Sequence, residues 1–496
     1  TMTSEDKESS APQGKTQTGT PTFTVSTPEV RITGYKLLNP NGNTPVEGNE
    51  IEVPDQGTYR INPTNGEVTF IPKPGFTGPA TGITVQATDE NGETKDAKYT
   101  PTVNALTITP QPATTTNIQG ETQEGTPTFP VPDESNNVTV TSRKLVDPVD
   151  QTEKDSVTLA GKGTFTIDGN GKVTFTPLPT YKGDVDPITV KATVIIRNDK
   201  NESTTIPSTT TYKPIIVSAE IDKEPATSTN LQGLTQTGTP TFKPKTVDVN
   251  GTPKTITVQP NSYKLVKDGK ESESLPAYKA GTAEQIGTYT INSATGQVTF
   301  TPLDKTYSGA VQPVDVQATG SNGVKVETTY TPIITPVTPT AEKSATTDVQ
   351  GKKQTSSIVL DTPENGADKD KTVNFNKGSQ VGANGERVEL DASTLTLLDG
   401  TNEVTSLTTN DGEYVLDKAS KTITFTPKKT FVGTATAVRV QIKDANGTKV
   451  ETTYTPTVTE VTPTGKDSAT TGLQGFAQKS PIVFNQKDEE DGKTVN

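Results

Sequence analysis

The chain contains no cysteine, no histidine and no tryptophan, and its single methionine is Met2. Without cysteine it cannot form a disulfide, a thioester or a thiolate metal site. Without histidine it lacks the usual general base at neutral pH and the commonest zinc ligand. These absences exclude catalysis by Cys–His or Ser–His–Asp groups and argue against transition-metal sites, so we expect no enzyme activity and no cofactor.

Long apolar runs and basic clusters are also missing. No apolar run reaches the ~18 residues that a membrane-spanning helix needs. The formal net charge of -13, without any run rich in Lys and Arg, argues against binding to nucleic acid. The sequence therefore predicts neither a membrane nor a nucleic-acid partner.

The hydrophobic content of 28% and the mean hydropathy of -0.59 lie near the range of disordered chains. The chain is rich in threonine, however, and threonine favours β-strands. Its apolar residues also recur in a regular pattern, which favours a folded chain.

A domain-sized internal repeat organises the sequence. A phrase of the type "NLQGLTQTGTPTF" recurs, and the glycines of its "QG" pair are Gly14, Gly120, Gly233, Gly351 and Gly475. A second phrase, of the type "TTYTPTV", closes each unit, and stretches such as "TPVTPTAEKSATT" (335–347) follow it. Pro- and Thr-rich stretches of this kind are typical of linkers.

These phrases predict four tandem domains and the start of a fifth. The expected boundaries are 1–12 for a disordered N-terminal segment, then 13–108, 113–221, 226–337 and 344–462 for repeats 1 to 4, and 464–496 for a truncated fifth repeat. The fifth copy stops at "GKTVN" (492–496), so we expect residues after about 464 to be poorly ordered and the chain to be a piece of a longer protein.

The stretch "GTYTINSATGQVTFTP" (287–302) has a near-copy in every repeat. Apolar residues alternate with polar ones on both sides of a turn, which is typical of a β-hairpin with one buried face. The predicted core positions are Tyr59, Ile61, Val68, Phe70, Phe165, Ile167, Val173, Phe175, Tyr289, Ile291, Val298, Phe300, Tyr414, Leu416, Ile423 and Phe425. The predicted turn positions are Gly66, Gly171, Gly296 and Lys421.

The turn positions need a positive φ, which glycine adopts without strain and lysine does not. Downstream, "PVDVQAT" (313–319) and "VKVETTYTP" (324–332) alternate in the same way around the turn "SNG". With the strands expected upstream, each repeat has about seven short strands, the number typical of a two-sheet sandwich. The predicted fold class is all-β, a tandem array of four β-sandwich-like domains with an incomplete fifth unit.

The three phrases together resemble the CshA-type fibril repeat of Gram-positive surface adhesins, over about residues 13–462. The resemblance implies a cell-wall-anchored fibril in which such repeats form a stalk, while a separate N-terminal region, absent here, carries host adhesion. The sequence has no wall-sorting "LPxTG" motif. Repeat 4 is the most divergent, with "SSIVL" replacing "GTPTF" and an insertion at 376–393.

Three features of the sequence have both a functional and a structural interpretation. "DENG" (89–92) and "DANG" (444–447) could hold calcium, but each offers too few carboxylates and suits a hairpin turn. The acidic run "DEEDG" (488–492) suits a solvated loop, and the repeated aromatics suit a core rather than a ligand-stacking surface.

A Lys–Asn isopeptide bond remains an alternative. Lys36, Lys144 and Lys264 recur at one position, but Asn62 and Asn292 face Asp168 and Asp417 in the other repeats. An exposed strand lysine is the simpler interpretation.

The sequence therefore predicts a structural stalk segment, extracellular and cell-wall anchored in the full-length protein. Its partners are neighbouring repeats of the same chain, and host matrix proteins or other bacteria through the missing tip. The alternatives are a binding module, in which a repeat contacts a host matrix glycoprotein or another bacterium, and partly disordered repeats that act as springs.

Overall fold

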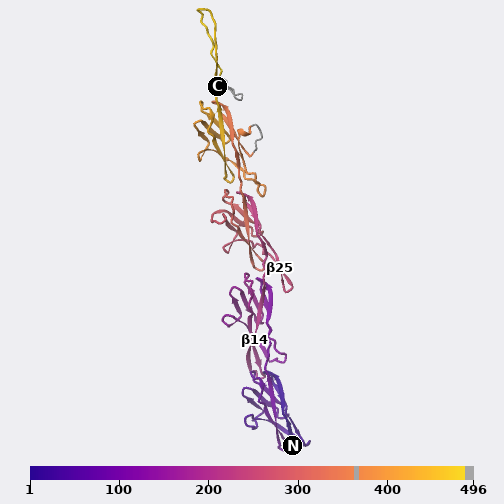
Figure 1. The fold of residues 1–496 in the computed structure, drawn as a ribbon. Coiled ribbons are helices and arrows are strands. Elements are labelled where there is room, and N and C mark those ends of the chain that lie inside the picture. The colour runs from indigo at the N-terminus through magenta and orange to yellow at the C-terminus, as the bar shows by residue number, and fades with distance from the viewer. Residues whose placement is uncertain (362–367, 486–496) are drawn as a thin grey trace. The chain divides into compact units, whose positions relative to one another are not determined.

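The computed structural model describes residues 1–361 and 368–485. Within these ranges the one helical element is the 3-10 turn η1 (Lys369–Lys371), and every other regular element is a strand (Figure 1). None of the described residues form a helix long and apolar enough to span a membrane. The prediction of an all-β fold is confirmed.

The chain forms two compact units. The first contains Thr1–Ile221, Pro244–Thr257 and Gly320–Lys325, which are repeats 1 and 2 with one hairpin and one turn of repeat 3. The second contains Asp222–Lys243, Val258–Thr319 and the chain from Val326 on, which are the rest of repeat 3 and repeat 4.

Repeat 1 has two sheets. The larger contains, in order, β2 (Lys7–Pro12), β11 (Thr94–Asn104), β10 (Ile83–Asp89) and β5 (Ile32–Leu38), with β9 (Gly78–Pro79) beside β11. The smaller contains β3 (Gln17–Gly19), β8 (Val68–Pro72), β7 (Gly57–Ile61) and β6 (Glu50–Val53). A separate pair consists of β1 (Met2–Glu5) and β4 (Thr22–Val25).

Repeat 2 has the same two sheets. The larger contains β12 (Ala113–Ile118), β20 (Ser203–Val217), β19 (Ile188–Arg197), β14 (Val138–Val146) and β15 (Glu153–Lys154). The smaller contains β13 (Gln123–Gly125), β18 (Val173–Pro177), β17 (Gly163–Ile167) and β16 (Ser156–Leu159).

Repeat 3 keeps this order. Its larger sheet contains β22 (Ala226–Leu231), β33 (Lys325–Thr335), β32 (Val314–Thr319), β27 (Lys264–Lys267) and β28 (Lys270–Ser272). Its smaller sheet contains β23 (Gln236–Gly238), β31 (Val298–Pro302), β30 (Gln285–Ile291) and β29 (Ser274–Tyr278). Two further pairs are β21 (Asp222–Glu224) with β24 (Thr241–Lys243), and the hairpin β25 (Lys245–Val249) with β26 (Thr252–Ile256).

Repeat 4 extends the smaller sheet. The first sheet contains β35 (Ser344–Val349), β45 (Lys449–Thr459), β44 (Val438–Asp444), β38 (Leu390–Asp399) and β39 (Asn402–Val404), with β43 (Gly433–Thr434) beside β45. The second contains β34 (Thr340–Glu342), β37 (Val373–Asn376), β36 (Gln354–Leu360), β42 (Thr422–Pro427), β41 (Gly412–Asp417) and β40 (Ser406–Thr408). The divergent phrase "SSIVL" therefore still forms a strand, β36.

Two expectations about the ends of the repeats are wrong. Residues 1–12, expected to be disordered, form β1 and β2, and β2 pairs with β11 over six residues. The expected linker at 335–347 contains β34 and most of β35. In both places a polar, Thr- and Ser-rich segment gains backbone hydrogen bonds by joining a sheet edge, which does not require an apolar pattern.

In the described part of the fifth repeat, up to residue 485, β46 (Thr464–Lys466) pairs with β47 (Val483–Asn485). Its large apolar side chains Leu473, Phe476, Ile482 and Phe484 are exposed. A core is therefore not assembled by the described residues of this unit.

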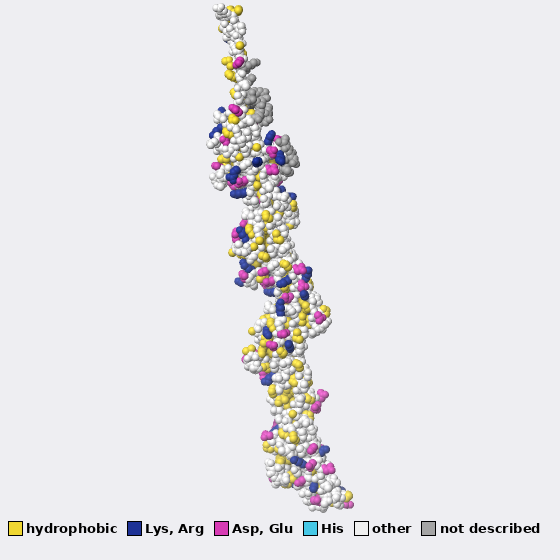
Figure 2. Space-filling model, viewed as in Figure 1, with side chains coloured by type: hydrophobic (Ala, Val, Ile, Leu, Met, Phe, Trp, Pro, Cys, Tyr) yellow, Lys and Arg dark blue, Asp and Glu magenta, His cyan; other side chains and the backbone are white. Residues whose placement is uncertain are grey.

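On the face shown in Figure 2, Lys and Arg are interspersed with Asp and Glu.

Candidate load-bearing site

The first strand of each large sheet pairs in parallel with the last strand of the same repeat. The pairs are β2 with β11, β12 with β20, β22 with β33, and β35 with β45, each over six residues. The register begins at the tyrosine of the closing phrase, which lies opposite Lys7, Ala113, Ala226 or Ser344 in repeats 1 to 4. This pairing joins the two ends of a repeat.

A side-chain bridge lies beneath the parallel pair. In repeat 3 the Ser228 hydroxyl donates to Gln236 Oε1 at 2.7 Å and shares a hydrogen bond of 2.7 Å with the Tyr330 hydroxyl. Gln236 Nε2 in turn donates to the carbonyl of Ile333 at 3.1 Å. One hydroxyl and one glutamine therefore connect the first strand, the next strand and the last strand.

The same bridge recurs in the other three repeats. Its members are Ser9, Gln17 and Tyr99; Thr115, Gln123 and Tyr212; and Thr346, Gln354 and Tyr454. In the incomplete fifth repeat, Thr470 already donates to Gln478 at 2.6 Å. The "Q" of "QTGTPTF" thus has a structural role that the sequence analysis did not identify, although the constant spacing of eight residues between hydroxyl and glutamine was a usable signal.

In repeats 1 to 3 the residue two positions after this glutamine is a glycine, and the tyrosine ring packs against it. A Cβ added to Gly19, Gly125 or Gly238 would lie 2.2, 2.6 or 2.4 Å from the ring of Tyr99, Tyr212 or Tyr330. In repeat 4 the position is Ser356, whose hydroxyl bonds to the Ser344 hydroxyl and to the carbonyl of Lys371. The glycine of this phrase in repeats 1 to 3 is therefore required by packing.

The repeated hairpin supplies the rest of the core. All 16 predicted core positions lie inward and are buried, except that Ile291 is only partly buried. In each repeat the first hairpin aromatic packs edge to face on the bridging tyrosine, with ring centroids 6.0–6.4 Å apart. Such pairs contribute ~0.5–1.5 kcal/mol beyond the area that they bury.

Burial controls the ionisation of the bridging tyrosines. It raises the pKa of Tyr99, Tyr212 and Tyr330 above the ordinary value, and that of Tyr454 to about 12. Tyr59 is also buried with a raised pKa, but its hydroxyl lies near the backbone of Gly82 without the geometry of a hydrogen bond. The phenols are therefore neutral at physiological pH and remain hydrogen-bond donors.

The hairpin turns have the backbone that the sequence requires. Gly66, Gly171 and Gly296 have φ of 78°, 86° and 76°, and Lys421 has φ of 50°. The preceding Asn or Asp caps each turn: Asn292 Oδ1 accepts from the Ala294 amide and Asp417 Oδ1 from the Ala419 amide, both at 2.9 Å.

Replacing Lys421 with glycine is expected to stabilise repeat 4 by up to ~1 kcal/mol. Relief of left-handed strain, ~1–2 kcal/mol for a non-glycine residue, outweighs the ~0.5–1 kcal/mol entropic cost of a glycine. Hydrogen exchange of the full chain, read by mass spectrometry on peptides of repeat 4, measures the change. Lys418→Gly is the control in the same turn, without a positive φ, and should destabilise; an unchanged or less stable K421G would contradict the expectation.

The acidic turns act as caps. Asp89 Oδ1 accepts from the amides of Asn91 and Glu93 at 2.9 Å, and Asp444 Oδ1 from those of Asn446 and Thr448. Among the described residues no cluster of three or more acidic side chains is placed to hold a metal ion. The run "DEEDG" (488–492) lies outside the described residues.

Two of the three candidate isopeptide lysines make ion pairs with carboxylates. Lys144 Nζ lies 2.7 Å from Asp155 Oδ1, and Lys264 Nζ lies 2.8 Å from Glu273 Oε1. Asn62 Oδ1 accepts from the backbone of its own turn, at Thr64. Lys36 is exposed.

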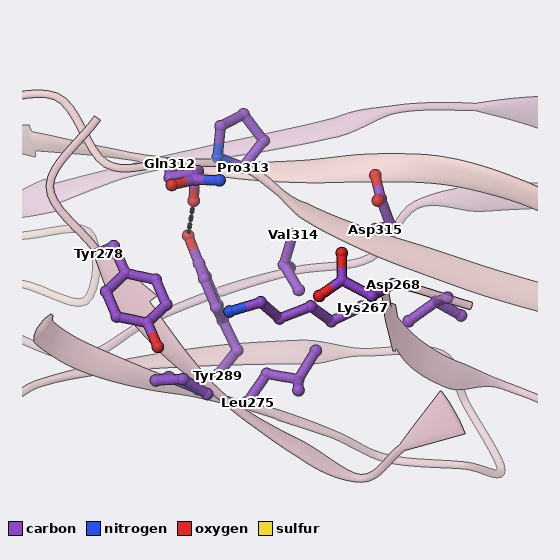
Figure 3. A pocket seen from close by; sticks show the side chains of 11 residues that line it. Lys267, Asp268, Leu275, Tyr278, Tyr289, Gln312, Pro313, Val314 and Asp315 are labelled. Atoms are coloured by element: carbon purple, nitrogen blue, oxygen red, sulfur yellow. Dashed lines mark hydrogen bonds between the residues drawn. The ribbon is translucent and has the colours of Figure 1, made fainter. Parts of the chain in front are cut away.

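Two cavities lie within single repeats, and a third, of about 320 Å³, lies within the second compact unit, lined by residues of repeat 3 such as Leu234 and residues of repeat 4 such as Ala383. One in repeat 3, of about 190 Å³, is lined by Lys267, Tyr278 and Tyr289 among others (Figure 3). Lys267 Nζ lies 4.7 Å from the Tyr278 ring centroid, and the Tyr289 hydroxyl donates to the carbonyl of Gln312 at 2.6 Å, as Figure 3 shows. A cavity of about 460 Å³ in repeat 2 has one carboxylate in its lining, Asp186, so it does not hold a pair of carboxylates.

Comparison with solved structures finds other tandem β-domain proteins at low similarity. Sidekick-1 immunoglobulin domains 1–5 match with 13% identity over 92% of this chain and 79% of that one, at a TM-score of 0.22. The titin I9–I11 tandem matches with 12% identity over 68% of this chain and 100% of that one, at a TM-score of 0.27. Drosophila N-cadherin EC1–4 matches with 12% identity over 92% of this chain and 99% of that one, at a TM-score of 0.19. These scores are too low to support an argument about function. No match is found among curated proteins.

The family comparison is specific. The profile described as the surface adhesin CshA repetitive domain matches four consecutive segments, residues 1–103, 105–216, 218–334 and 336–458. Each segment includes one parallel strand pair and one hydroxyl–Gln–Tyr bridge. The chain therefore belongs to the repetitive-domain family of the CshA surface adhesins, and membership implies a location on the outside of the cell.

Proposed function

We propose that this chain is a non-catalytic stalk segment of a bacterial surface fibril, which bears tension between a cell wall and an adhesive tip. The observation that carries the proposal is the parallel pairing of the first and last strands of the large sheet in all four repeats. A stalk that holds a bound tip must resist force applied along the chain.

Parallel terminal strands suit that task for a geometric reason. The chain enters at the start of one strand and leaves at the end of its parallel neighbour, so the two points of force lie at opposite ends of the pair. Tension then shears the evenly spaced hydrogen bonds of the ladder together. In an antiparallel hairpin pulled from its open end, the same bonds break one after another.

The hydroxyl–Gln–Tyr bridge adds side-chain bonds across the same load path. Ser228 lies on the first strand and Tyr330 on the last, and Gln236 connects both to the backbone of the last strand. Hydrogen bonds in a buried setting contribute ~0.5–1.5 kcal/mol each and are costly to leave unmade. The bridge therefore resists sliding of the two strands.

Force spectroscopy on the full chain, pulled from its ends, tests the proposal. We expect four unfolding steps, each releasing on the order of 350 Å, because about 100 residues extend by ~3.3–3.6 Å each. As a control, force applied through Lys162→Cys and Leu178→Cys peels the hairpin β17–β18, and it should break that hairpin at a lower force.

Repeats that unfold from the chain ends at the force of the peeled hairpin would refute a load-bearing role. Saturable binding of a host matrix glycoprotein to this chain would instead favour the binding-module alternative.

A further inference from the structure

The backbone of the "QG" pair in repeats 1 to 3 meets an asparagine of the next repeat. Asn446 Nδ2 of repeat 4 donates to the carbonyl of Gln232 in repeat 3 at 2.7 Å, within the second compact unit. Asn322 Nδ2, in a repeat 3 loop of the first unit, donates to the carbonyl of Gln119 in repeat 2 at 2.8 Å. The remaining junction, between repeats 1 and 2, shows the same kind of contact.

At the junction of repeats 1 and 2 the donor comes from a different place in the sequence. Asn137, just before β14, donates through Nδ2 to the carbonyl of Gln13 at 3.1 Å. Asn322 and Asn446 instead lie in the hairpin turn between the last two strands of their repeats. Two unrelated loops thus place the same amide on the same carbonyl, which points to a property of the receiving turn.

The glutamine side chain stabilises that turn by hydrogen bonds within its own repeat. Gln232 Nε2 donates to the carbonyl of Thr306 at 2.7 Å, and its Oε1 accepts from the amide of Val337 at 3.2 Å. Gln13 and Gln119 make the same two kinds of bond inside repeats 1 and 2. Both ends of the glutamine side chain are hydrogen-bonded within its own repeat. The group that accepts a hydrogen bond from the next repeat is the backbone carbonyl of the glutamine.

The glycine provides the space that the neighbour occupies. Gly14, Gly120 and Gly233 have φ of 77°, 81° and 82°. An added Cβ would lie 2.5 Å from Asn137 Nδ2, 2.1 Å from the Asn322 carbonyl oxygen and 1.8 Å from Asn446 Oδ1, respectively. Glycine is therefore required here by the docked loop as well as by the backbone.

Two of the three docked asparagines are removed from water, whereas Asn137 is only partly buried. Asn322 is 5% exposed and Asn446 6% exposed. Beside the junction of repeats 3 and 4, Leu231 and Val337 of repeat 3 form an apolar cluster with Val388, from the insertion in repeat 4. A buried amide is costly to leave without a hydrogen bond, so the glutamine carbonyl favours this docking position. Asn322 Nδ2 also donates to the carbonyl of Ala219 at 2.9 Å, and Asn137 Nδ2 to that of Arg197 at 2.7 Å.

Repeat 4 has the same turn without an occupant among the described residues. Gln350 Nε2 donates to the carbonyl of Lys429 at 3.0 Å, and Gly351 has φ of 83°. No described atom lies within 4 Å of a Cβ built on Gly351, and Gln350 is only partly buried. The receiving turn therefore forms without a neighbour.

We propose that the Gln–Gly turn of each repeat is a docking site for the side-chain amide of an asparagine from the following repeat. Gln350–Gly351 is such a site for the loop of a further repeat. The site sets which faces of successive repeats meet, and it holds whether or not the chain acts as a stalk.

The test uses the full chain, whose lack of cysteine allows spin labels at Lys270→Cys in repeat 3 and Glu413→Cys in repeat 4. Pulsed electron paramagnetic resonance gives the distance distribution between the labels. The parent chain should show one narrow peak, and Asn446→Ala or Gly233→Ala should lose it in favour of a broad distribution.

Two matched variants control for local effects. Asn91→Ala changes the equivalent turn of repeat 1, whose Asn91 is exposed, and Gly351→Ala introduces the same backbone strain as Gly233→Ala without a docked loop. Both should keep the narrow peak, and hydrogen exchange should show repeats 3 and 4 folded in all variants. A narrow peak in folded N446A and G233A, or a broad one in G351A, would overturn the proposal.

Discussion

Replacing Tyr330 with alanine is expected to destabilise repeat 3 by ~3–5 kcal/mol, the cost of truncating a large buried aromatic side chain. The side chain is fully buried, its ring lies on Gly238 and packs edge to face on Tyr289, and its hydroxyl bonds to Ser228. Because small domains are stable by only ~5–15 kcal/mol, the loss consumes a large part of the stability of the repeat.

Hydrogen exchange of the full chain, read by mass spectrometry, localises the effect. Peptides of repeat 3 should lose protection, whereas those of repeat 1 should not, because each repeat has its own core. Tyr330→Phe keeps the ring and removes only the hydroxyl, so it should cost ~1 kcal/mol. If the stabilities of repeat 3 in Y330A and Y330F differ by less than ~1 kcal/mol, the ring is not the element that holds the end strands together.

The repeated hairpin could be predicted from the sequence because both of its strands have one buried and one exposed face. Period-two alternation records that arrangement directly, and the turn needs a residue that tolerates positive φ. Even Lys421, the one exception in sequence, has the left-handed backbone that the alignment with Gly296 requires. Ile291 is less buried than predicted: it lies at the end of its strand and is only partly buried.

The parallel strand could not be predicted in the same way. Strands such as β12 ("ATTTNI") carry polar residues on both faces and lie at a sheet edge, so their sequence matches that of a linker. What places them is a backbone ladder with a strand about 100 residues later, together with one hydroxyl and one glutamine. Single-strand periodicity contains no information about either partner.

The same reasoning separates the roles of the glycines in the opening phrase. Gly238 is needed because a tyrosine ring lies against it, and its φ is not positive. Gly233, five residues earlier, is needed for its positive φ and for the space taken by Asn446. Both are glycines in one short motif, yet one serves the core of a repeat and the other serves the junction, which the sequence alone does not distinguish.

Stability is expected to fall steeply between about pH 10 and 12. An unfolded tyrosine ionises near pH 10, whereas burial raises the pKa of Tyr454 to about 12. A raised folded-state pKa means that its contribution is complete below pH 10 and is lost as the pH rises towards 12, because only the unfolded chain then releases the proton. For Tyr454 alone this amounts to ~3 kcal/mol at 1.36 kcal/mol per pKa unit.

The loss should differ between repeats in a way that the structure fixes. Repeats 1, 3 and 4 each bury two tyrosines of raised pKa, whereas repeat 2 buries Tyr212 alone because Phe165 occupies the first position. Ion-paired lysines with raised pKa, such as Lys73 and Lys154, act in the same direction but lie at the surface, where salt screens them. The tyrosine contribution should persist at high salt.

An alkaline titration that follows tyrosinate absorbance together with circular dichroism measures this loss. Seven of the 12 tyrosines are fully buried, so absorbance should rise first for the others and then in step with loss of β-structure. Tyr454→Phe removes one titrating group from repeat 4 and should shift the alkaline transition of that repeat upward relative to the parent. If the buried tyrosines ionise near pH 10 while the β-structure is intact, their hydroxyls are accessible to water and the bridge cannot carry load between the end strands.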